Sequence, residues 1–492
     1  MRRCVKADRI TRRTLLAGLG AGATALTPAH AALLPPGRRT EKYDVIVIGT
    51  GMAGTAAALQ AKLDGGNVVV LEKMPEQRNS GNSRLAAGYF AVPSADTPEA
   101  RQNYLEDLVQ KSQGRGNAAI YRLLADNVLA DVAWMQEHGV QLSATVPQAP
   151  YRLSVAIAAP GAYVGMPSLL GTLRRRFTDL GGKIAYETKA KQLIMDDRGR
   201  VAGVRAVAPD GVVDFSANAV VIAAGGYAAN KLILEQFVDP NAGAMMVRGT
   251  PWATGDGLLM AQEAGAGLVN MAGLTSLHVA AVNPNETAAG NPFQAMPYCL
   301  AINREGRRYV DESLGYVANG KATLRQPRQT TALIFDEEIR KLPDVATSVG
   351  VFQRLHQPIV EAASLDELAR KIEVPAAQLA ETVASFNAAV KDDQATGANP
   401  PKAALARRVE APKFYAFYPL VPGITLSFGG LAIDASARVL EPDGRVIPRL
   451  YAAGEGAGGL YYDDYIGGSS LANCLVMGRV AGRLAQKESR LR

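Results

Sequence analysis

Residues 43–73 read YDVIVIGTGMAGTAAALQAKLDGGNVVVLEK, and this stretch decides the fold. Tyr43–Ile48 is a run rich in β-branched residues, typical of a buried parallel strand. It leads directly into a glycine-rich turn, then a helical segment, then a second short strand that ends at Glu72. This order of strand, turn, helix and acid-ended strand predicts a parallel α/β fold that binds a dinucleotide.

Individual residues of this unit have separate physical roles. Gly49 allows the tight turn, Gly51 lets the backbone approach a pyrophosphate, and Gly54 lets the helix pack closely on the strand. Ala53 lies in the first helical turn, where free N–H groups and the positive end of the helix dipole attract phosphate. Glu72 stands about 20 residues further on, where an acid accepts hydrogen bonds from ribose hydroxyls. We expect all five residues to contact the dinucleotide.

Most of the net charge lies in the first 31 residues. The chain has 53 basic and 46 acidic residues, a formal charge of +7, and residues 1–31 hold six of those bases and one of those acids. The remainder has a net charge of only +2, so its basicity does not indicate nucleic acid as a partner. Thr11–Leu16 contains a twin arginine, and Ala29–Ala31 supplies a cleavage pattern. We expect residues 1–31 to be a twin-arginine signal peptide, and the twin-arginine export machinery to deliver the folded protein to a bacterial periplasm.

Cysteines and histidines are few after this leader. Cys299 and Cys474 do not form a framework, and we expect two buried thiols. Neither a CxxC nor a CxxCH pattern occurs, so no covalent haem is expected. His138, His278 and His356 are too scattered in sequence to indicate a metal site, and we predict none.

Periodicity along the chain predicts further elements. Residues 98–137 and 167–180 have apolar residues at helical spacing, and Arg174–Arg176 is interpreted as a solvated helix face. Residues 183–224 read as short strands separated by turns. Beyond residue 270 the loops become rich in Asn, Pro and Thr, and after residue 423 the glycine-rich β/α pattern returns.

A nucleotide fold that stops and resumes implies an inserted domain. We predict an α/β protein with a Rossmann-like domain, consisting of a parallel sheet plus a small antiparallel sheet, interrupted by an α+β capping domain. The predicted parts are a linker at 32–42, the first part of the nucleotide-binding domain at 43–272, the capping domain at 273–426, and the second part at 427–492. An insert in this place can close over the reactive end of a cofactor.

Four further segments narrow the choice among nucleotide folds. They are Ser80–Gly88, Ala223–Gly226, Thr254–Gly257, and Tyr451–Glu455 with Gly467–Leu471 after it. Together with the first unit they resemble the fumarate reductase/succinate dehydrogenase flavoprotein superfamily, of the FAD-dependent oxidoreductase 2 type. The resemblance covers essentially the whole chain after the leader, in the order of that superfamily.

The resemblance implies FAD as the cofactor, with Glu72 on its adenosine ribose. It places Asn82, Ser83, Ala87 and Gly88 along the pyrophosphate and flavin side. It places Asp256, Glu455, Gly468, Ser470 and Leu471 in the cofactor site as well, toward the ribityl chain and isoalloxazine ring. Some relatives attach FAD through a histidine beside the Ser80–Gly88 loop. This chain has none there, so we predict non-covalent FAD.

Relatives move a hydride between flavin N5 and one carbon of a C–C bond, while a side chain handles a proton on the neighbouring carbon. The bond lies next to a carbonyl or carboxylate that stabilises the developing charge. The resemblance therefore implies an FAD-dependent oxidoreductase of the CH–CH type, acting on a small-molecule substrate. Members of the fumarate type clamp carboxylates with histidines and arginines.

This chain departs from the fumarate type at those positions. Tyr316 stands where the proton-donating arginine is found, Tyr465 stands where a carboxylate-binding arginine is found, and His278 alone remains of the histidines. We expect these three residues to be catalytic. One phenol can donate a hydrogen bond to a developing enolate, while the other removes a proton if its usual pKa near 10 is lowered. Arg325 or Arg328 is the candidate for a displaced positive charge.

The substrate class stays open at this point. The two tyrosines resemble 3-ketosteroid dehydrogenases, which act on cyclic ketones, whereas Gly459–Tyr465 and Gly423–Thr425 resemble tricarballylate-dehydrogenase-like members, which oxidise carboxylates. Two other readings are a flavin amine or alcohol oxidase, and a flavin electron-transfer protein without substrate chemistry. Because no haem is attached and the periplasm has no nicotinamide pool, we expect a separate cytochrome or a quinone-linked protein as electron partner.

Overall fold

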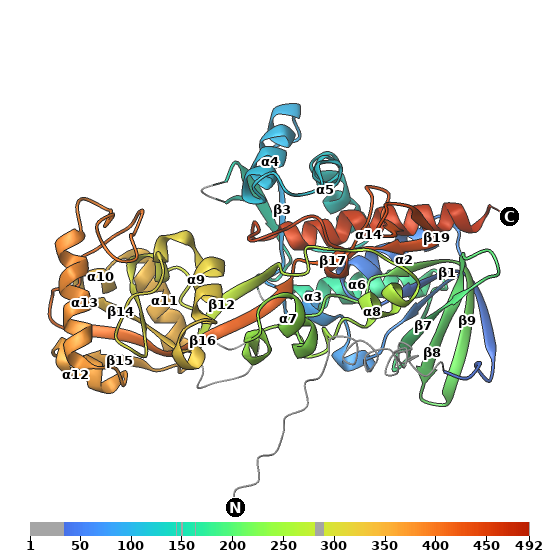
Figure 1. The fold of residues 1–492 in the computed structure, drawn as a ribbon. Helices are drawn as coiled ribbons and strands as arrows, with labels where there is room; N and C mark the ends of the chain where they lie inside the picture. The colour runs from blue at the N-terminus through green and yellow to red at the C-terminus, as the bar shows by residue number, and fades with distance from the viewer. Residues whose placement is uncertain (1–33, 144, 149–150, 163, 281–289, 492) are drawn as a thin grey trace, which may run out of the picture.

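The computed structural model describes residues 34–491 except 144, 149–150, 163 and 281–289. The predicted signal peptide lies outside the described residues. The chain forms a larger lobe and a smaller capping lobe, shown at the right and left of Figure 1. Two antiparallel strands, β12 (Leu274–Ala280) and β16 (Phe414–Ser427), pair with each other and run between the lobes.

The larger lobe is built on a mostly parallel sheet. Five of its strands are parallel neighbours in the order β19 (Val446–Ala452), β9 (Gly211–Ile222), β1 (Thr40–Ile48), β2 (Val68–Leu71) and β6 (Lys183–Ala185). Three strands add antiparallel pairs: β18 (Arg438–Leu440) on β19, and β7 (Lys189–Met195) with β8 (Val201–Ala208) on β9. The predicted fold class is confirmed. Strand β1 begins at Thr40, so the end of the predicted 32–42 linker belongs to the sheet.

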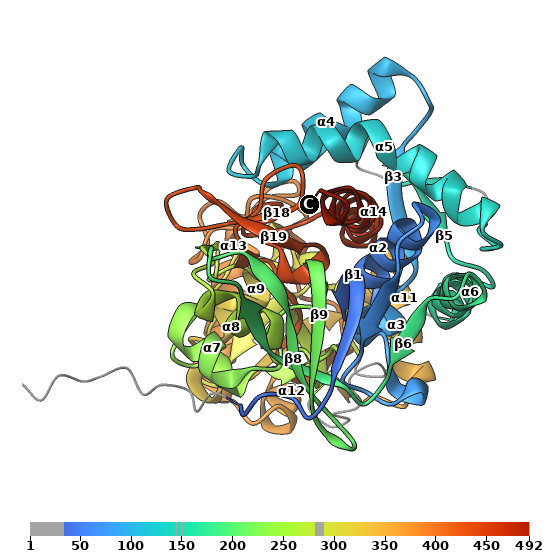
Figure 2. The same ribbon diagram turned by 90° about the vertical axis from the view of Figure 1, so that its right-hand side faces the viewer.

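Two helices from opposite ends of the chain pack side by side against this sheet: α2 (Met52–Leu63) and α14 (Ser469–Ser489) (Figure 2). Gly478 and Gly482 make their contact close. A Cβ atom at Gly482 would lie 2.1 Å from the carbonyl oxygen of Ala57 on α2, and one at Gly478 would lie 2.5 Å from that of Ala53. Helix α14 can approach α2 only because it has no side chains at these two positions.

Other segments surround this layer. They are α3 (Gly81–Leu85), β3 (Tyr89–Pro93), α4 (Pro98–Lys111), α5 (Ala118–Glu137), β4 (Val146–Pro147), β5 (Leu153–Ile157), α6 (Gly165–Asp179), α7 (Lys231–Phe237), α8 (Asp256–Glu263), β11 (Leu268–Val269) and β17 (Gly430–Leu431). The prediction of helix across 98–137 is wrong at its centre. Gln113 and Gly114 adopt φ values of 54° and 71°, which end α4 before α5 begins.

The capping lobe has its own sheet and core. Its strands are β10 (Met246–Val247), β12, β13 (Leu300–Asn303), β14 (Thr331–Asp336), β15 (Ile359–Ala362) and β16, and its helices are α9 (Tyr316–Thr323), α10 (Glu337–Arg340), α11 (Pro343–Arg354), α12 (Leu365–Lys371) and α13 (Ala376–Ala389). Phe335, Phe352 and Phe417 stack in its core, with ring centroids 4.5–5.0 Å apart along the chain of contacts.

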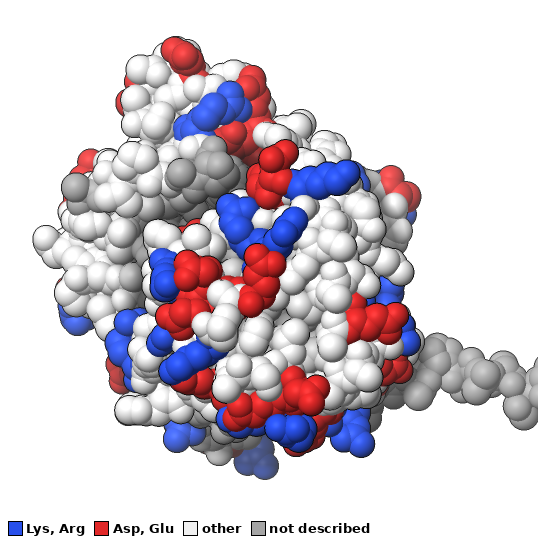
Figure 3. All heavy atoms as spheres, turned by 90° about the vertical axis from the view of Figure 1, so that its left-hand side faces the viewer, with Lys and Arg blue, Asp and Glu red and all other residues white. Residues whose placement is uncertain are grey.

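Acidic and basic side chains are interspersed on the outer face of the capping lobe (Figure 3). Exposed ion pairs such as Lys341–Glu338 and Lys413–Glu361 account for part of this mixture. Within residues 34–491, apart from the gaps named above, no helix is both long and apolar enough to span a bilayer.

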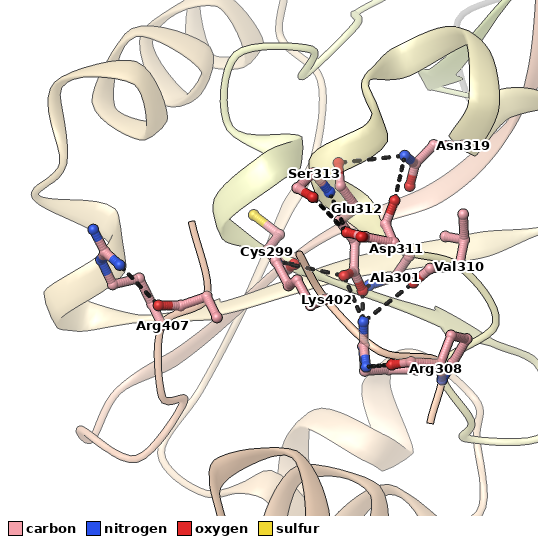
Figure 4. Close-up of polar contacts among 12 residues, drawn as sticks. Cys299, Ala301, Arg308, Val310, Asp311, Glu312, Ser313, Asn319, Lys402 and Arg407 are labelled. Carbon is pink, nitrogen blue, oxygen red and sulfur yellow. Dashed lines mark hydrogen bonds and ion pairs between the residues drawn. The ribbon is translucent and has the colours of Figure 1, made fainter. Parts of the chain in front are cut away.

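A buried charge cluster fixes the segment that leads into α9 (Figure 4). Arg308, Glu312 and Lys402 are each 0–1% exposed at their side chains, with the Glu312 carboxylate 2.8 Å from Arg308 and 3.4 Å from Lys402. Burial alone would raise the pKa of Glu312, but the two cations outweigh it and hold that pKa below its usual value. Lys402 also donates to the Cys299 carbonyl, and Asn319 donates to the carbonyls of residues 311, 312 and 315. The start of α9 is therefore held by a fully buried polar network.

Both predicted buried thiols are confirmed. Cys299 and Cys474 are free and buried, and burial raises the pKa of each thiol.

We predict that Glu312→Gln lowers the free energy of unfolding by about 3–5 kcal/mol, because it leaves Arg308 and Lys402 uncompensated in the core. Urea denaturation of the variant measures this loss. The control is Glu338→Gln, which removes an exposed pair with Lys341 and should cost less than about 1 kcal/mol. Equal losses in the two variants would contradict a structural role for the buried cluster.

Candidate active site

The sequence motifs converge at one edge of the parallel sheet. The Ala223 N–H donates to the Ile48 carbonyl and the Ala453 N–H donates to the Ile222 carbonyl, so β1, β9 and β19 end side by side. The turns that leave these strands therefore meet: Gly49–Gly54, Ala223–Gly226 and Gly454–Glu455. The carboxyl edge of a parallel sheet is where such folds bind ligands.

The glycine-rich turn has the geometry that its sequence predicts. Gly49 has a φ of 102°, and a Cβ atom at Gly54 would lie 2.0 Å from the Gly49 carbonyl oxygen. Gly51 is the N-cap of α2, and its small size leaves the first turn open, with Ala53 buried behind it against Gly454. The left-handed turn and the close helix–strand contact at this place therefore require glycine.

Glu72 holds the turn to the end of β2. Its buried carboxylate accepts hydrogen bonds from the Thr50 N–H (3.1 Å), the Thr50 hydroxyl and the Met74 N–H (2.9 Å). Its placement beside the glycine-rich turn agrees with the adenosine end of the cofactor, and its contact with ribose stays a prediction.

Asn82 joins four parts of the chain. Its amide nitrogen donates to Glu455 (2.9 Å) and to the Thr425 carbonyl (3.0 Å), and its amide oxygen accepts from the Thr250 N–H (2.7 Å). The neighbouring Ser83 hydroxyl accepts from the Met52 N–H at the start of α2 (3.0 Å). The structure thus brings the predicted residues Asn82, Ser83 and Glu455 together at the glycine-rich turn.

The carboxylate of Glu455 lies between Asn82 and Ser427 at this junction. Burial raises the pKa of Glu455, and hydrogen bonds from Ser427 and Asn82 only partly oppose this rise. The closest of these donors is the Asn82 amide nitrogen, at 2.9 Å, and the Ser427 N–H lies at 3.0 Å.

The remaining predicted residues lie around the start of α14. Gly468 is its N-cap with a φ of 87°, and Ser470 and Leu471 lie in its first turn. The Gly468 carbonyl accepts from the Ala91 N–H of β3. Ala87 and Gly88 immediately precede β3, and Gly88 has a φ of 82°. Two loops far apart in sequence therefore meet beside this helix start.

Asp256 is placed at the other end of the site. Its carboxylate lies 2.6 Å from Lys73, the residue after Glu72, and 3.0 Å from Lys189. Burial alone would raise the pKa of Asp256, but these two lysines outweigh it and lower that pKa overall. These partners lie near Glu72 and favour the adenosine end of the cofactor, whereas the sequence placed Asp256 toward the flavin ring.

The residues present fit FAD. Helices α2 and α14 both begin at a glycine N-cap, without a hydrogen bond from a cap side chain and without an acid in the first turn. Each leaves a positive helix end for the negative groups of a dinucleotide. The residues that would hold FAD are Gly49, Gly51, Ala53, Gly54, Glu72, Asn82, Ser83, Ala87, Gly88, Asp256, Glu455, Gly468, Ser470 and Leu471. When bound, FAD supplies hydride exchange at its N5.

Tyr316 and Tyr465 come together from different lobes. Tyr316 is the first residue of α9 in the capping lobe, Tyr465 precedes α14, and the two phenols lie close enough for Tyr465 to raise the pKa of Tyr316. Burial first, and then the neighbouring Tyr465 and Asp464, raise the pKa of Tyr316 well above its usual value. The sequence left open which phenol removes a proton, and the raised pKa of Tyr316 does not suit it to that role. A phenol that stays protonated is suited to donate a proton or a hydrogen bond.

Charged groups flank this pair of phenols. Lys111 lies 2.6 Å from Asp464 and 5.9 Å from the ring centroid of Tyr151. Burial alone would lower the pKa of Lys111, but Asp464 outweighs it and raises that pKa. On the solvent side, Asp463 lies near Arg115 and 3.6 Å from Lys321 of α9. The ion pair of Asp463 with Lys321 joins the two lobes beside the phenols.

The other predicted catalytic groups have different outcomes. His278 lies on β12, where its backbone pairs with Pro422, and its side chain is outside the described part of the chain. The Arg325 side chain is 77% exposed, with its guanidinium 3.3 Å from Asp239. Arg325 is exposed and already has Asp239 as its partner, so it does not fit a cation that binds the substrate. Arg328 has a φ of 57° and lies in an exposed turn, and no contact in the structure links it to the phenols.

Sequence reasoning missed two residues near the adenosine end. Arg174 was interpreted as part of a solvated face, but its guanidinium donates to the Ser80 hydroxyl, and burial lowers its pKa. A hollow of about 230 Å³ lies between the 76–84 loop and α6, and Arg174 and Ser80 both line it. Lys73 is the second residue, through its ion pair with Asp256. Its position directly after the acid-ended strand was the available signal.

We predict that Glu455 makes the wild type lose stability as the pH rises. Its pKa is raised in the folded state, so its favourable contribution is full below about pH 4.5 and disappears as the pH passes the folded value. With FAD in excess, the melting temperature of wild type minus that of Glu455→Gln should fall as the pH rises from 4.5 and then level off. A difference that is constant or increases over this range would contradict the raised pKa of Glu455 in the folded state.

Comparison with known proteins shows which family this fold and site resemble. The sequence profile of a family described as "FAD binding domain" matches residues 44–471. The chain is 30% identical over 469 residues to a fumarate reductase (cytochrome) of Shewanella frigidimarina, covering 92% of this chain and 78% of that protein.

Solved structures have the same fold. The open conformation of a flavocytochrome c3 fumarate reductase superposes with a TM-score of 0.75 at 25% identity, covering 99% of this chain and 83% of that one. A 3-ketosteroid-Δ4-(5α)-dehydrogenase of Rhodococcus jostii RHA1 superposes with a TM-score of 0.71 at 24% identity, covering 91% and 97%, and shows the fold alone. The chain therefore belongs to the fumarate reductase/succinate dehydrogenase flavoprotein superfamily, as an FAD-dependent oxidoreductase of the CH–CH type.

Proposed function

We propose that this enzyme reduces a C=C bond next to a carboxylate or carbonyl, with Tyr316 as the proton donor. The observation that carries this role is the position of Tyr316, which begins α9 in the capping lobe and approaches Tyr465 of the larger lobe. Its phenol keeps its proton at physiological pH, and reduction requires an acid that protonates the carbon next to the activating group.

The structure around Tyr316 supports this role. Gly315 is the N-cap of α9 and has a φ of 89°. Tyr316, the first residue of the helix, therefore has a fixed position in the capping lobe. The ring of Phe293 stands edge-on at 6.2 Å and covers part of its surface. Such shielding keeps the phenol in a poorly solvated setting, where a hydrogen-bond donor interacts strongly with developing charge.

Tyr465 orients the donor. Its ring packs against Phe428 and Tyr461 at centroid distances of 5.6 and 5.7 Å. This packing leaves the Tyr465 ring little freedom, so the Tyr316 phenol meets a rigid neighbour. As the proton leaves Tyr316, Tyr465 can stabilise the resulting phenolate by donating to it.

We predict that Tyr316→Phe lowers kcat about 10²- to 10⁴-fold without loss of bound FAD, because it removes the positioned acid. Tyr465→Phe should lower kcat less, since the donor remains. Reduced methyl viologen as electron donor and the FAD absorbance of the purified variants give both quantities. The matched control is Tyr462→Phe, whose ring lies under Arg115. An unchanged kcat in Tyr316→Phe would refute the assignment.

The second candidate is a 3-ketosteroid-type dehydrogenase on a cyclic ketone. The observation that favours it is the close approach of the two tyrosines, which can bind and enolise a carbonyl without a fixed cation. Oxidised enzyme with an artificial electron acceptor separates the two functions. Rapid dehydrogenation of a 3-ketosteroid, with no reduction of enoates, would favour this second function.

We also propose a periplasmic location and a separate electron partner, a cytochrome or a quinone-linked protein. The twin-arginine pattern at Thr11–Leu16 supports the location, and the missing haem-attachment pattern supports the partner.

We predict that the purified protein turns over with reduced viologen but not with NADH or NADPH alone. Steady-state rates measured with the same concentration of each electron donor test this prediction. Rapid turnover with a nicotinamide would contradict the separate partner.

A further inference from the structure

Arg248 extends the short strand β10 along β16. Met246 and Val247 pair with Gly423 and Ile424 in parallel register, and the Arg248 N–H donates to the Ile424 carbonyl at 2.7 Å. Arg248 therefore stands next to Thr425, one residue beyond the paired segment.

Side-chain alternation places both residues on the face that Tyr316 covers. Val247 and Ile424 pack into the apolar cluster beneath the sheet, whereas Met246 packs with Val421 and Tyr316 on the opposite face. Because neighbouring side chains on a strand point to opposite faces, Arg248 and Thr425 share the face of Met246.

Two polar atoms on this face are buried and unsatisfied. Nε of Arg248 and Oγ1 of Thr425 have no hydrogen-bond partner among the residues that the structure describes. Native proteins rarely bury such atoms without a partner, so each of them calls for an explanation. A ligand that accepts from both atoms supplies one.

The position of these atoms relates them to the reaction. The Thr425 carbonyl accepts from Asn82, which also binds Glu455, and a Cβ atom at Gly249 would lie 2.5 Å from the Asn82 amide oxygen. Arg248 and Thr425 therefore stand between the cofactor residues and Tyr316.

Other cations of this region already have partners. Lys111 pairs with Asp464, Arg115 and Lys321 pair with Asp463, and Arg325 pairs with Asp239. The Arg248 guanidinium makes no ion pair with any described residue. A single guanidinium without an ion-pair partner suits a substrate that carries a single negative charge.

We propose that Arg248 and Thr425 bind the carboxylate of an α,β-unsaturated monocarboxylate whose far end is neutral. The inference rests on the proposed function and names the substrate class of that same site. Arg248 donates to the carboxylate, Thr425 donates its hydroxyl, and Tyr316 protonates the carbon next to that carboxylate.

The test compares a charged substrate with its neutral analogue, crotonate with crotonamide, using the FAD-loaded enzyme and reduced methyl viologen. Arg248→Met should lower kcat/KM for crotonate about 10- to 150-fold, the usual effect of losing a hydrogen bond to a charged group, and leave the crotonamide rate unchanged. Arg248→Lys should restore part of the loss, and Thr425→Val should give a smaller loss. Arg325→Met is the matched control and should behave as wild type.

Binding gives a readout independent of turnover. The dissociation constant of butyrate for oxidised enzyme, followed by the change in flavin absorbance, should rise in Arg248→Met by a similar factor, with the FAD content unchanged. An unchanged constant overturns the inference, as does a loss in Arg325→Met instead. A wild type that prefers fumarate to crotonate overturns the single-carboxylate assignment. If wild type reduces no enoate at all, the proposed function fails, and the butyrate constants still decide whether Arg248 binds a carboxylate.

Discussion

The close contact between α2 and α14 determines where the other parts of the site can lie. Gly478 and Gly482 let α14 touch the backbone of α2, so both helix starts reach the same end of the sheet. This contact returns the last segment of the chain to the turn at Gly49–Gly54. Glu455 and Gly468 become neighbours of the first motif for this reason, although they lie about 400 residues further along the chain. A side chain at either glycine would separate the two halves of the cofactor site.

The capping lobe depends on a second constraint, the long strand β16. It pairs with β12 and with β10, which connects the lobe to the residues around Asn82. At the base of α9 the buried Glu312, with Arg308 and Lys402, fixes the polypeptide just before Tyr316. The position of the Tyr316 phenol therefore follows from the packing of the whole lobe and not from a flexible loop.

Sequence patterns predicted the first nucleotide-binding unit, because its residues form one local motif, whereas Asn82, Ser83 and Glu455 were placed in the site through the family resemblance. Strand β16 was missed, since Pro419, Pro422 and Gly423 interrupt its β pattern, and Pro419 falls at a register shift in the pairing with β14. Tyr316 and Tyr465 were found only through resemblance, and nothing local indicates that their phenols meet. Arg248 and Arg174 were not identified as site residues, because the environment of an arginine depends on distant strands and loops.

The close approach of Tyr316 and Tyr465 links one lobe to the other. Any motion that admits substrate by swinging the lobes apart also breaks this link and exposes the Tyr316 hydroxyl to water. An open molecule can then exchange ligands but lacks an assembled acid, and protonation is confined to the closed molecule. The proton donor is therefore complete only where the two lobes meet.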